Sequence, residues 1–462
     1  MSDKNQTAIK FAPKKASEDS IAFKIFHASS ASGGAMMIAA ILSSYFSVYM
    51  TDTMMIPAAS ASLIMFIATL WDAINDPIMG VLADKTRTKF GRYRPYFLAA
   101  PLLLTFFAVM LWVNPNLSST GKFVYVLVMY IGYGMTVTMY TMPQTAVLPA
   151  SVKSDDKRNS ILSLGAGFSA LAFTIGSSYA GSIKTFFENT LHVSNGYIPL
   201  MICCGVLACV SFWGLFATSD ERYVNHVEQQ PGLRSLVSVL KHKELAPFIV
   251  VWVLAALGYG LNFSSTVYYL TYYMKRPDLI STYFLIGSIG GLGSMFVLLP
   301  LLLKIFKSGH KALIFTQAIS IVGYVILFFT GKLNPYYLIF ASSFVSFFST
   351  MENALVNVLV NDAIDYIQLK DGIAANGVIS SIKGFAQKCG NTVVSSGILA
   401  VLSISGYVAG DIENQPASAM FALNFIRFGA PAVIGILIIF FLRFNPCEKH
   451  KDEIAAMKAK ME

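Results

Sequence analysis

Two aspartates and an asparagine stand close together in an apolar part of the sequence, in the run Trp71-Asp-Ala-Ile-Asn-Asp-Pro77. Asp72 and Asp76 are four residues apart, so a helix places both carboxyl groups on one face, with Asn75 beside them. Two carboxylates and an amide oxygen suit Na⁺ or Li⁺, and two carboxyl groups can share a proton. This chemistry predicts a site for a coupling ion, a monovalent cation only. The alternative is structural, with both acids paired to basic residues on other helices.

A run of small, acidic and basic residues follows directly, between Gly80 and Pro95. Glycine permits close helix approach and tight turns, and the charged side chains can form charge-assisted hydrogen bonds to neighbouring helices. The order of these residues favours a gating latch, although a positively charged inner loop would share much of the composition. The predicted latch residues are Gly80, Asp84, Arg87, Gly91, Arg92 and Arg94.

Other ionisable residues stand inside apolar stretches, where a charged group is costly and therefore marks a candidate for function. Lys383 and Lys388 share one stretch, and each needs a partner, a cavity or a route to the surface. We expect at least one of them to bind a substrate oxygen or to pair with the aspartates. Glu352 is a candidate for a second ion or substrate group. Arg427 is interpreted as reaching the lipid headgroups, and His27 as a satisfied polar contact.

Five tyrosines stand in one apolar stretch. Four of them, Tyr268, Tyr269, Tyr272 and Tyr273, lie near its outer end, where interfacial belts are rich in tyrosine, and are interpreted mostly as anchors. Tyr259 lies deeper and is a candidate to stack on a sugar ring. The five cysteines show no metal-ligand spacing and the six histidines do not cluster. With no nucleophile–base pair or phosphate loop either, we predict that the chain is not an enzyme and needs no cofactor beyond a coupling cation.

Membrane-spanning helices must position these residues, because the chain is too apolar for a soluble globule. Hydrophobic residues make up 55% of its 462 positions and charged residues 13%, against about 25% charged in an average soluble protein. The same composition excludes disorder, and long continuous apolar runs exclude a β-barrel. The sequence therefore predicts an all-α, polytopic membrane protein.

Twelve apolar stretches are long enough to cross a bilayer about 30 Å thick. One long polar connection separates the first six from the last six, which is typical of transporters built from two repeated halves. We predict an N-terminal half with its polar tail at 1–217, a cytoplasmic loop at 218–245, a C-terminal half at 246–443 and a cytoplasmic tail at 444–462. The predicted spans lie near 24–50, 55–83, 94–113, 121–149, 159–183, 197–217, 246–274, 280–303, 312–330, 334–361, 373–404 and 417–443.

The distribution of lysine and arginine predicts the orientation. With both termini inside, the inner segments hold 26 of the 34 basic residues and the outer segments hold 5. Cytoplasmic segments of membrane proteins carry such an excess. The net charge of +9 is thus a topology signal and requires no nucleic-acid partner. We expect a multi-pass protein of the cell membrane with cytoplasmic termini and no cleavable signal peptide.

The motif around the aspartate pair resembles that of the glycoside–pentoside–hexuronide:cation symporters, the melibiose-permease group of the major facilitator superfamily. The resemblance rests on the run from Trp71 to Gly80, on Ala83-Asp-Lys-Thr-Arg87 and on Gly91-Arg-Tyr-Arg-Pro95. Because further matches lie in both halves, it covers nearly the whole chain. It implies the major facilitator fold and symport of a sugar or glycoside with Na⁺, Li⁺ or H⁺. The further matches are Tyr49-Met-Thr-Asp52, Asp156-Lys-Arg-Asn-Ser160, Asp362-Ala-Ile-Asp-Tyr366, Gly377 and Phe385-Ala-Gln-Lys388-Cys-Gly390.

The resemblance also implies roles for single residues. The family's cation site uses the acidic pair, the asparagine between them and a threonine of the fourth helix, here Thr138. The stretches that carry acidic sugar ligands in melibiose permeases read Ser32-Gly-Gly-Ala-Met36 and Thr141 here, and an expected arginine falls in the uncharged run 163–167. This departure argues against a galactoside and leaves a xyloside, a glucuronide, another oligosaccharide or a non-sugar open. The candidate substrate contacts are Thr141, Gln144, Tyr259, Asn262 and Lys388.

Two other hypotheses compete with a symporter. A proton-coupled exporter of another small solute would show export and no cation-stimulated sugar uptake. A sensor with the architecture of a transporter would bind its ligand without counterflow. For the symporter, the expected partners are a small sugar or glycoside and the lipid bilayer, and the expected functional unit is a monomer.

Overall fold

The computed structural model describes residues 20–223, 243–371, 376–450, 453–454 and 457. Within these residues the chain is helical, and its one β-type contact is an isolated bridge between Thr88 and Gly91. The predicted all-α class is therefore confirmed. Parts of the predicted N-terminal tail, central loop and C-terminal tail lie outside the described residues.

Ten segments of the described chain are long and apolar enough to cross a membrane. Together with the shorter apolar helix α4 (Tyr96–Leu111) and the long helix α16 (Asn376–Ile404), they account for each of the twelve predicted stretches. The ten segments are Ile21–Phe46, Ala58–Gly80, Ser119–Ser151, Asp155–Leu191, Tyr197–Thr218, Ala246–Tyr273, Pro277–Phe306, Gly309–Thr330, Pro335–Lys370 and Ala417–Leu442.

The chain divides into two compact units, and the division departs from the order of the sequence. Unit 1 comprises Met1–Leu42 and Ile67–Glu228, and unit 2 comprises Ser43–Phe66 and Gln229–Glu462. A segment of the first two predicted spans thus packs with the second unit. The predicted boundaries after residues 217, 245 and 443 remain predictions along the sequence.

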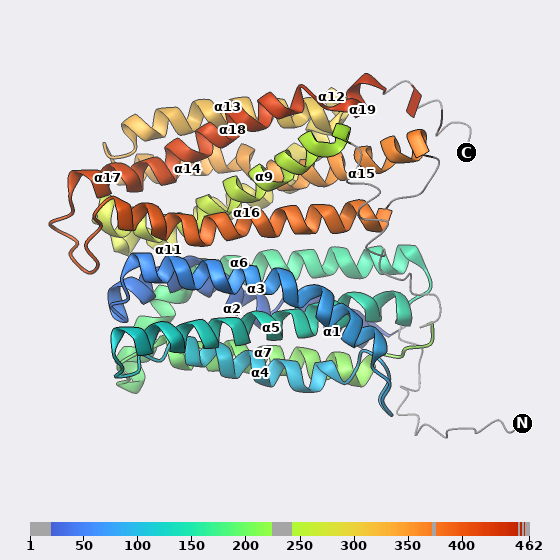
Figure 1. Ribbon diagram of the computed structural model, residues 1–462, viewed down its shortest axis with the longest axis horizontal. Coiled ribbons are helices and arrows are strands. Elements are labelled where there is room, and N and C mark those ends of the chain that lie inside the picture. Colours follow the sequence, from blue (N-terminus) through green and yellow to red (C-terminus); the bar gives the residue numbers. More distant parts are fainter. Residues whose placement is uncertain (1–19, 224–242, 372–375, 451–452, 455–456, 458–462) are drawn as a thin grey trace, which may run out of the picture. The chain divides into compact units, whose positions relative to one another are not determined.

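Unit 1 is a bundle in which α4 packs against α5 and α7, and α6 packs against α1 and α2 (Figure 1). Small residues allow the close approaches. A Cβ added at Gly34 would lie 2.2 Å from the carbonyl oxygen of Cys204, so only glycine lets α2 and α7 approach this closely. The helices are α1 (Ile21–Ser30), α2 (Gly34–Ile41), α3 (Ala58–Lys85, from Ile67 onward), α4, α5 (Ser119–Ser151), α6 (Asp155–Leu191) and α7 (Tyr197–Thr218).

In unit 2, α9 packs against α15, α16 and α18 (Figure 1). Five one-turn π-helical segments interrupt the described helices of the chain, a feature frequent at functional sites. The elements of unit 2 are α9 (Ala246–Ser264), α10 (Thr266–Tyr268), η6 (Tyr269–Tyr273), η7 (Pro277–Leu279), α11 (Ile280–Gly293), η8 (Ser294–Leu298), α12 (Leu299–Phe306), α13 (Gly309–Thr330), α14 (Pro335–Ser349), α15 (Met351–Asp371), α16, α17 (Ala417–Asn424), η9 (Phe425–Gly429), α18 (Ala430–Leu442) and α19 (Pro446–Lys449), preceded by η2 (Leu42–Phe46) and η3 (Tyr49–Thr53).

Large apolar side chains are exposed along many of these helices. Phe296 is 71% exposed and Phe329 is 76% exposed, and many other large apolar side chains of the described chain are exposed as well. Soluble domains rarely expose so much apolar surface. Lipid chains cover such surface at no cost, whereas the backbone polar groups are satisfied within each helix. The exposed apolar surface therefore agrees with a membrane-spanning protein.

Candidate functional site

The aspartates predicted to hold a cation meet α5 within unit 1. Thr138 donates a hydrogen bond from Oγ1 to Asp76 Oδ1 at 2.9 Å. Asp72 lies against Gly134, where an added Cβ would come within 2.2 Å of its Oδ1. Asn75 and Thr138 are buried, at 3% and 4% exposure. The structure thus places the four predicted cation-site residues on facing sides of α3 and α5.

Sequence reasoning missed part of this cluster. Tyr130 and Tyr133 interact electrostatically with Asp72, and Gly134 provides the space for its carboxylate. A signal was present, because Tyr130, Gly134 and Thr138 are spaced by four and share one face of α5. This face of α5 therefore presents an aromatic ring, a glycine and a hydroxyl in successive turns to the acidic residues. Its oxygen-rich chemistry suits a small cation or a shared proton.

The predicted latch is organised by Glu221, another residue to which sequence reasoning assigned no role. Its carboxylate accepts hydrogen bonds from the backbone N–H groups of Arg92, Tyr93 and Arg94, at 2.7, 2.8 and 3.0 Å. The Arg94 side chain donates from Nε and Nη2 to the carbonyl oxygen of Phe216, at 3.1 and 2.8 Å. Burial lowers the pKa of the Arg94 guanidinium, and the Glu221 carboxylate opposes that shift. The contacts tie the segment before α4 to the end of α7.

The other latch residues lie apart from this contact. Gly80 is buried on α3, and the exposed Arg87 donates from Nη1 to the carbonyl oxygen of Thr86 at 2.8 Å. The side chain of Asp84 lies outside the described residues. Gly91, Arg92 and Arg94 therefore form one structure around Glu221, while the gating role of the whole set remains a prediction.

Replacing Gly91 with alanine is expected to destabilise unit 1. Gly91 has a φ of +114°, and an added Cβ would lie 2.8 Å from Glu221 Oε1. The substitution should lower the free energy of unfolding by about 1–3 kcal/mol. The measurement is thermal unfolding in detergent. In Gly181→Ala, on α6, no atom lies within 4 Å of the new Cβ, so this control should keep or raise stability; equal stability of the two variants would contradict the expectation.

Two predicted substrate residues belong to unit 1. Thr141 donates from Oγ1 to the carbonyl oxygen of Val137 at 2.9 Å. Gln144 links α5 to α1, because its Nε2 donates to the carbonyl oxygen of His27 at 3.3 Å and His27 Nε2 donates to the Gln144 carbonyl at 3.1 Å. His27 is therefore a satisfied polar contact, as predicted.

Three predicted substrate residues belong to unit 2. Asn262 is held by a network, since its Nδ2 donates to Tyr324 Oη at 2.8 Å and its Oδ1 accepts from Arg427 Nη1 at 2.8 Å. Tyr259 is 36% exposed, with its ring 4.9 Å from that of Phe263. Lys388 is half-buried on α16. The substrate roles of these residues remain predictions.

The interpretation of Arg427 as a residue that reaches the headgroups is wrong. Its side chain is 3% exposed and also donates a hydrogen bond to the Tyr283 hydroxyl. Hydropathy located the residue within a span but gave no indication of which side of the helix faces lipid. A buried arginine inside a helical bundle marks a candidate polar site.

The tyrosines interpreted as interfacial anchors are also largely buried. Tyr268, Tyr269 and Tyr272 are each at most 1% exposed. Tyr272 and Tyr407 donate hydrogen bonds to Asp52, the latter at 2.8 Å. Asp52 lies between the first two spans, in the segment Ser43–Phe66 that belongs to unit 2. The tyrosines therefore hold this segment to α10, η6 and the loop after α16.

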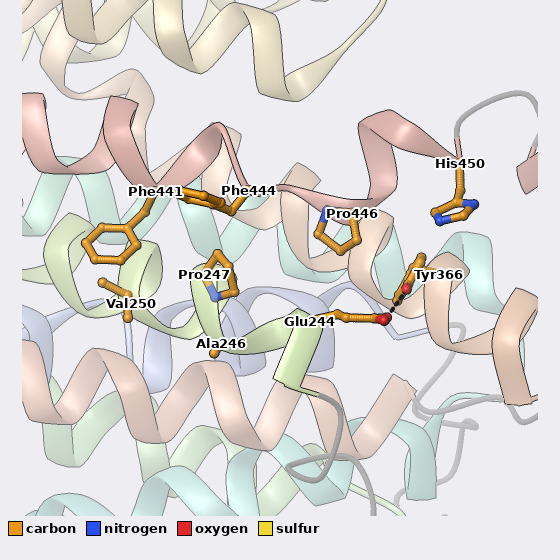
Figure 2. Close-up of a pocket in the computed structure, with 9 residues that line it drawn as sticks. All are labelled: Glu244, Ala246, Pro247, Val250, Tyr366, Phe441, Phe444, Pro446 and His450. Carbon is orange, nitrogen blue, oxygen red and sulfur yellow. Dashed lines mark hydrogen bonds between the residues drawn. The ribbon is translucent and has the colours of Figure 1, made fainter.

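A cavity of about 580 Å³ opens elsewhere in unit 2, among the ends of α9, α15 and α18 (Figure 2). Figure 2 shows Glu244 and Tyr366 pointing toward one another, and the Tyr366 hydroxyl donates to the Glu244 carboxylate. Lys370 forms an ion pair with the same carboxylate. The cavity contains none of the predicted substrate residues. It is lined by Glu244, Ala246, Pro247, Val250, Tyr366, Phe441, Phe444, Pro446 and His450.

Comparison with known proteins places the chain in a family. Residues 28–449 match the family model described as MFS/sugar transport protein. The uncharacterized symporter YnaJ of Bacillus subtilis (strain 168) is 25% identical over 424 residues, which cover 90% of this chain and 89% of the relative. The isoprimeverose transporter of Lactiplantibacillus pentosus is 26% identical over 399 residues, covering 84% and 81%.

A solved structure shares the fold. The crystal structure of a bacterial homolog of the human lysosomal transporter Spinster, inward-facing and unoccupied, matches with a TM-score of 0.66 at 9% identity, covering 94% of this chain and 97% of the other. At that identity the match concerns the fold alone. The family match covers most of the chain and agrees with its apolar helices. The chain therefore belongs to the MFS/sugar transport protein family and is a multi-pass membrane transporter.

Proposed function

We propose that the chain is a secondary active transporter that carries a sugar or glycoside together with Na⁺, Li⁺ or H⁺ by alternating access. The cation is held by Asp72, Asn75, Asp76 and Thr138. The observation that carries this proposal is the hydrogen bond from Thr138 to Asp76, made where Asp72 lies against Gly134. A hydroxyl from α5 meets a carboxylate from α3 there, and Asn75 is buried on the same helix as the two aspartates; oxygen groups of this kind suit a small monovalent cation.

The charge of the two carboxylates can couple cation binding to sugar binding. Two carboxylates in a buried site repel one another, and a bound cation removes that repulsion. If the cation-loaded site favours the state that binds sugar, the cation raises sugar affinity and the sugar raises cation affinity by the same factor. Such coupling free energies are typically about 1–3 kcal/mol.

The substrate class is supported by the family and by one relative. The family is described as sugar transport protein, and a relative with similar length is an isoprimeverose transporter. The candidate contacts Thr141 and Gln144 in unit 1, and Tyr259, Asn262 and Lys388 in unit 2, offer hydroxyl, amide, ring and ammonium groups. We infer a transporter that acts as a monomer in the cell membrane, with both termini in the cytoplasm, as the excess of basic residues in the inner segments favours.

Counterflow in reconstituted vesicles tests the proposal. Vesicles are loaded with isoprimeverose, a glucuronide or a galactoside, and entry of the labelled sugar is followed with Na⁺, Li⁺ or a pH gradient. We expect one sugar class to exchange and one cation to stimulate it. Sugar flux that no cation changes would contradict the proposal of cation coupling. Sugar binding without any flux would favour a sensor.

Replacing Thr138 with valine is expected to weaken cation stimulation, because the substitution removes the hydroxyl oxygen and the hydrogen bond that it donates to Asp76. The expected cost is about 1–3 kcal/mol, which is about a 5- to 150-fold loss of apparent cation affinity. Thr138→Ser keeps the hydroxyl and serves as the matched control. The measurement is the cation concentration that gives half-maximal stimulation of counterflow, and equal values for valine and serine would exclude Thr138 as a ligand.

A further inference from the structure

A buried glutamate stands near the middle of a membrane span in unit 2. Glu352 belongs to the span Pro335–Lys370, so about 17 residues of helix, or about 25 Å, separate it from either end. Its side chain is 5% exposed. A charged carboxylate at this depth is strongly disfavoured unless it is paired or reaches a water-filled cavity.

The surroundings of Glu352 supply no counter-charge in contact. Gln317 on α13 hydrogen-bonds to its carboxyl group, and an added Cβ at Gly258 on α9 would lie 3.3 Å from Oε2. Oε1 is buried and has no hydrogen-bond partner among the residues that the structure describes. In the same part of the chain, no basic side chain forms an ion pair with Glu352. A carboxyl group in these surroundings is most stable with its proton bound.

An unsatisfied donor lies in the neighbouring network. Arg427 donates from Nη1 to Asn262 and from Nη2 to Tyr283, while its Nε is buried without a partner in the described chain. Asn262 in turn donates to Tyr324. Tyr324 interacts electrostatically with both Arg427 and Glu352. An acid and a base, each with one unsatisfied polar atom, therefore flank the same tyrosine.

Other titratable groups lie on the helices that pack against α15. Tyr324 on α13 interacts electrostatically with Glu352 and with Arg427. From α16, Gln387 donates a hydrogen bond to Asn353, the residue next to Glu352, at 3.4 Å. The titratable groups on elements that pack against α15 include Tyr259 on α9, Tyr324 on α13, and Lys383 and Lys388 on α16. Arg427 lies on η9, which packs against α9 and α13.

We propose that Glu352 is a proton-binding site of unit 2, separate from the carboxylate pair of unit 1, and that it exchanges its proton when its carboxylate pairs with Arg427. In the protonated state, Arg427 remains bonded to Asn262 and Tyr283. On release, the carboxyl O–H bond breaks, the proton passes to water, and the carboxylate accepts a hydrogen bond from Arg427 Nε. The two states differ by one proton and by the partners of one arginine. A transport cycle that passes through the protonated and the ionised state of Glu352 moves a proton independently of the cation at Asp76.

Infrared spectroscopy of the full chain in lipid vesicles, titrated from acidic to alkaline pH, tests this site without a substrate. We expect the carbonyl stretch of a protonated carboxyl group at neutral pH and its loss at alkaline pH. The band should be missing from Glu352→Gln. It should be intact in Glu188→Gln, which changes a glutamate paired with Lys184 at 3.1 Å. If Glu352→Gln fails to fold, Glu352→Asp should shift the band.

Arg427→Gln gives a second, independent readout. Without the guanidinium, the ionised carboxylate has no counter-charge, so the band should persist to higher pH than in the wild type. Equal protonated-carboxyl absorption in the wild type and Glu352→Gln at every pH would show that Glu352 is ionised throughout, and would overturn the proposal. A Glu352 band that never disappears at alkaline pH would also overturn it, because a proton that does not leave cannot be exchanged.

Discussion

Replacing Asp76 with asparagine is expected to abolish cation-stimulated transport while the protein stays folded. Asparagine keeps an oxygen in place to accept the hydrogen bond that Thr138 now gives to Asp76 at 2.9 Å, so the substitution removes the charge with little change in shape. Removing the carboxylate that is paired with a buried cation costs about 3–5 kcal/mol, which corresponds to at least about a hundredfold loss of cation affinity. The measurement is the cation dependence of sugar counterflow.

A matched variant separates the loss of a ligand from a general effect of charge. Asp155→Asn changes an aspartate whose side chain is 84% exposed and paired with Arg158 on the same helix. Exposed pairs of this kind contribute about 0–1 kcal/mol, so this variant should behave as the wild type. If Asp76→Asn instead unfolds and retains cation stimulation in its folded fraction, the aspartate pair has the structural role that the sequence also permitted.

The positions of the spans and of the aspartate pair were predictable, because both depend on short-range pattern. A bilayer requires about 20 apolar residues for each span, and spacing by four places Asp72 and Asp76 on one face whatever lies around them. The position of Thr138 opposite Asp76 came from resemblance to a family. No local pattern in α5 alone pairs that hydroxyl with a carboxylate 62 residues earlier.

The structural features that sequence reasoning missed depend on contacts between segments far apart in the sequence. Glu221 binds backbone N–H groups about 128 residues earlier, and backbone donors leave no trace in side-chain composition. Arg427 and Tyr268 were placed correctly within their spans but on the wrong side of the helix. Hydropathy measures how apolar a window is, whereas burial depends on which face neighbouring helices cover. The assignment of Ser43–Phe66 to unit 2 depends on contacts such as those of Asp52 and likewise has no local signal.

Adding a single methyl group at Gly134 is expected to cause the second large loss of cation affinity. In Gly134→Ala the new Cβ would lie 2.2 Å from Asp72 Oδ1, a separation that real side chains essentially never show. Because Gly134 is inside α5, the backbone cannot yield easily, and the Asp72 carboxylate must move away from the cluster. Overpacking of this kind costs about 1–3 kcal/mol, so apparent cation affinity should fall about 5- to 150-fold.

Helix propensity makes this prediction sharper. Alanine stabilises an unhindered helix relative to glycine by about 0.5–1 kcal/mol, so any loss must arise from the contact with Asp72. Gly167→Ala, on α6 with no atom within 4 Å of its added Cβ, is the control and should keep its cation affinity. The informative comparison is Gly134→Ala in the Asp72→Asn background, where an uncharged and movable amide replaces the carboxylate. If the cation is bound by Asp72, the alanine should then add little further loss, because the two changes act on the same ligand. Additive losses would place the effect of Gly134 in general packing of α5, and an unchanged cation affinity in Asp72→Asn alone would remove Asp72 from the cation site.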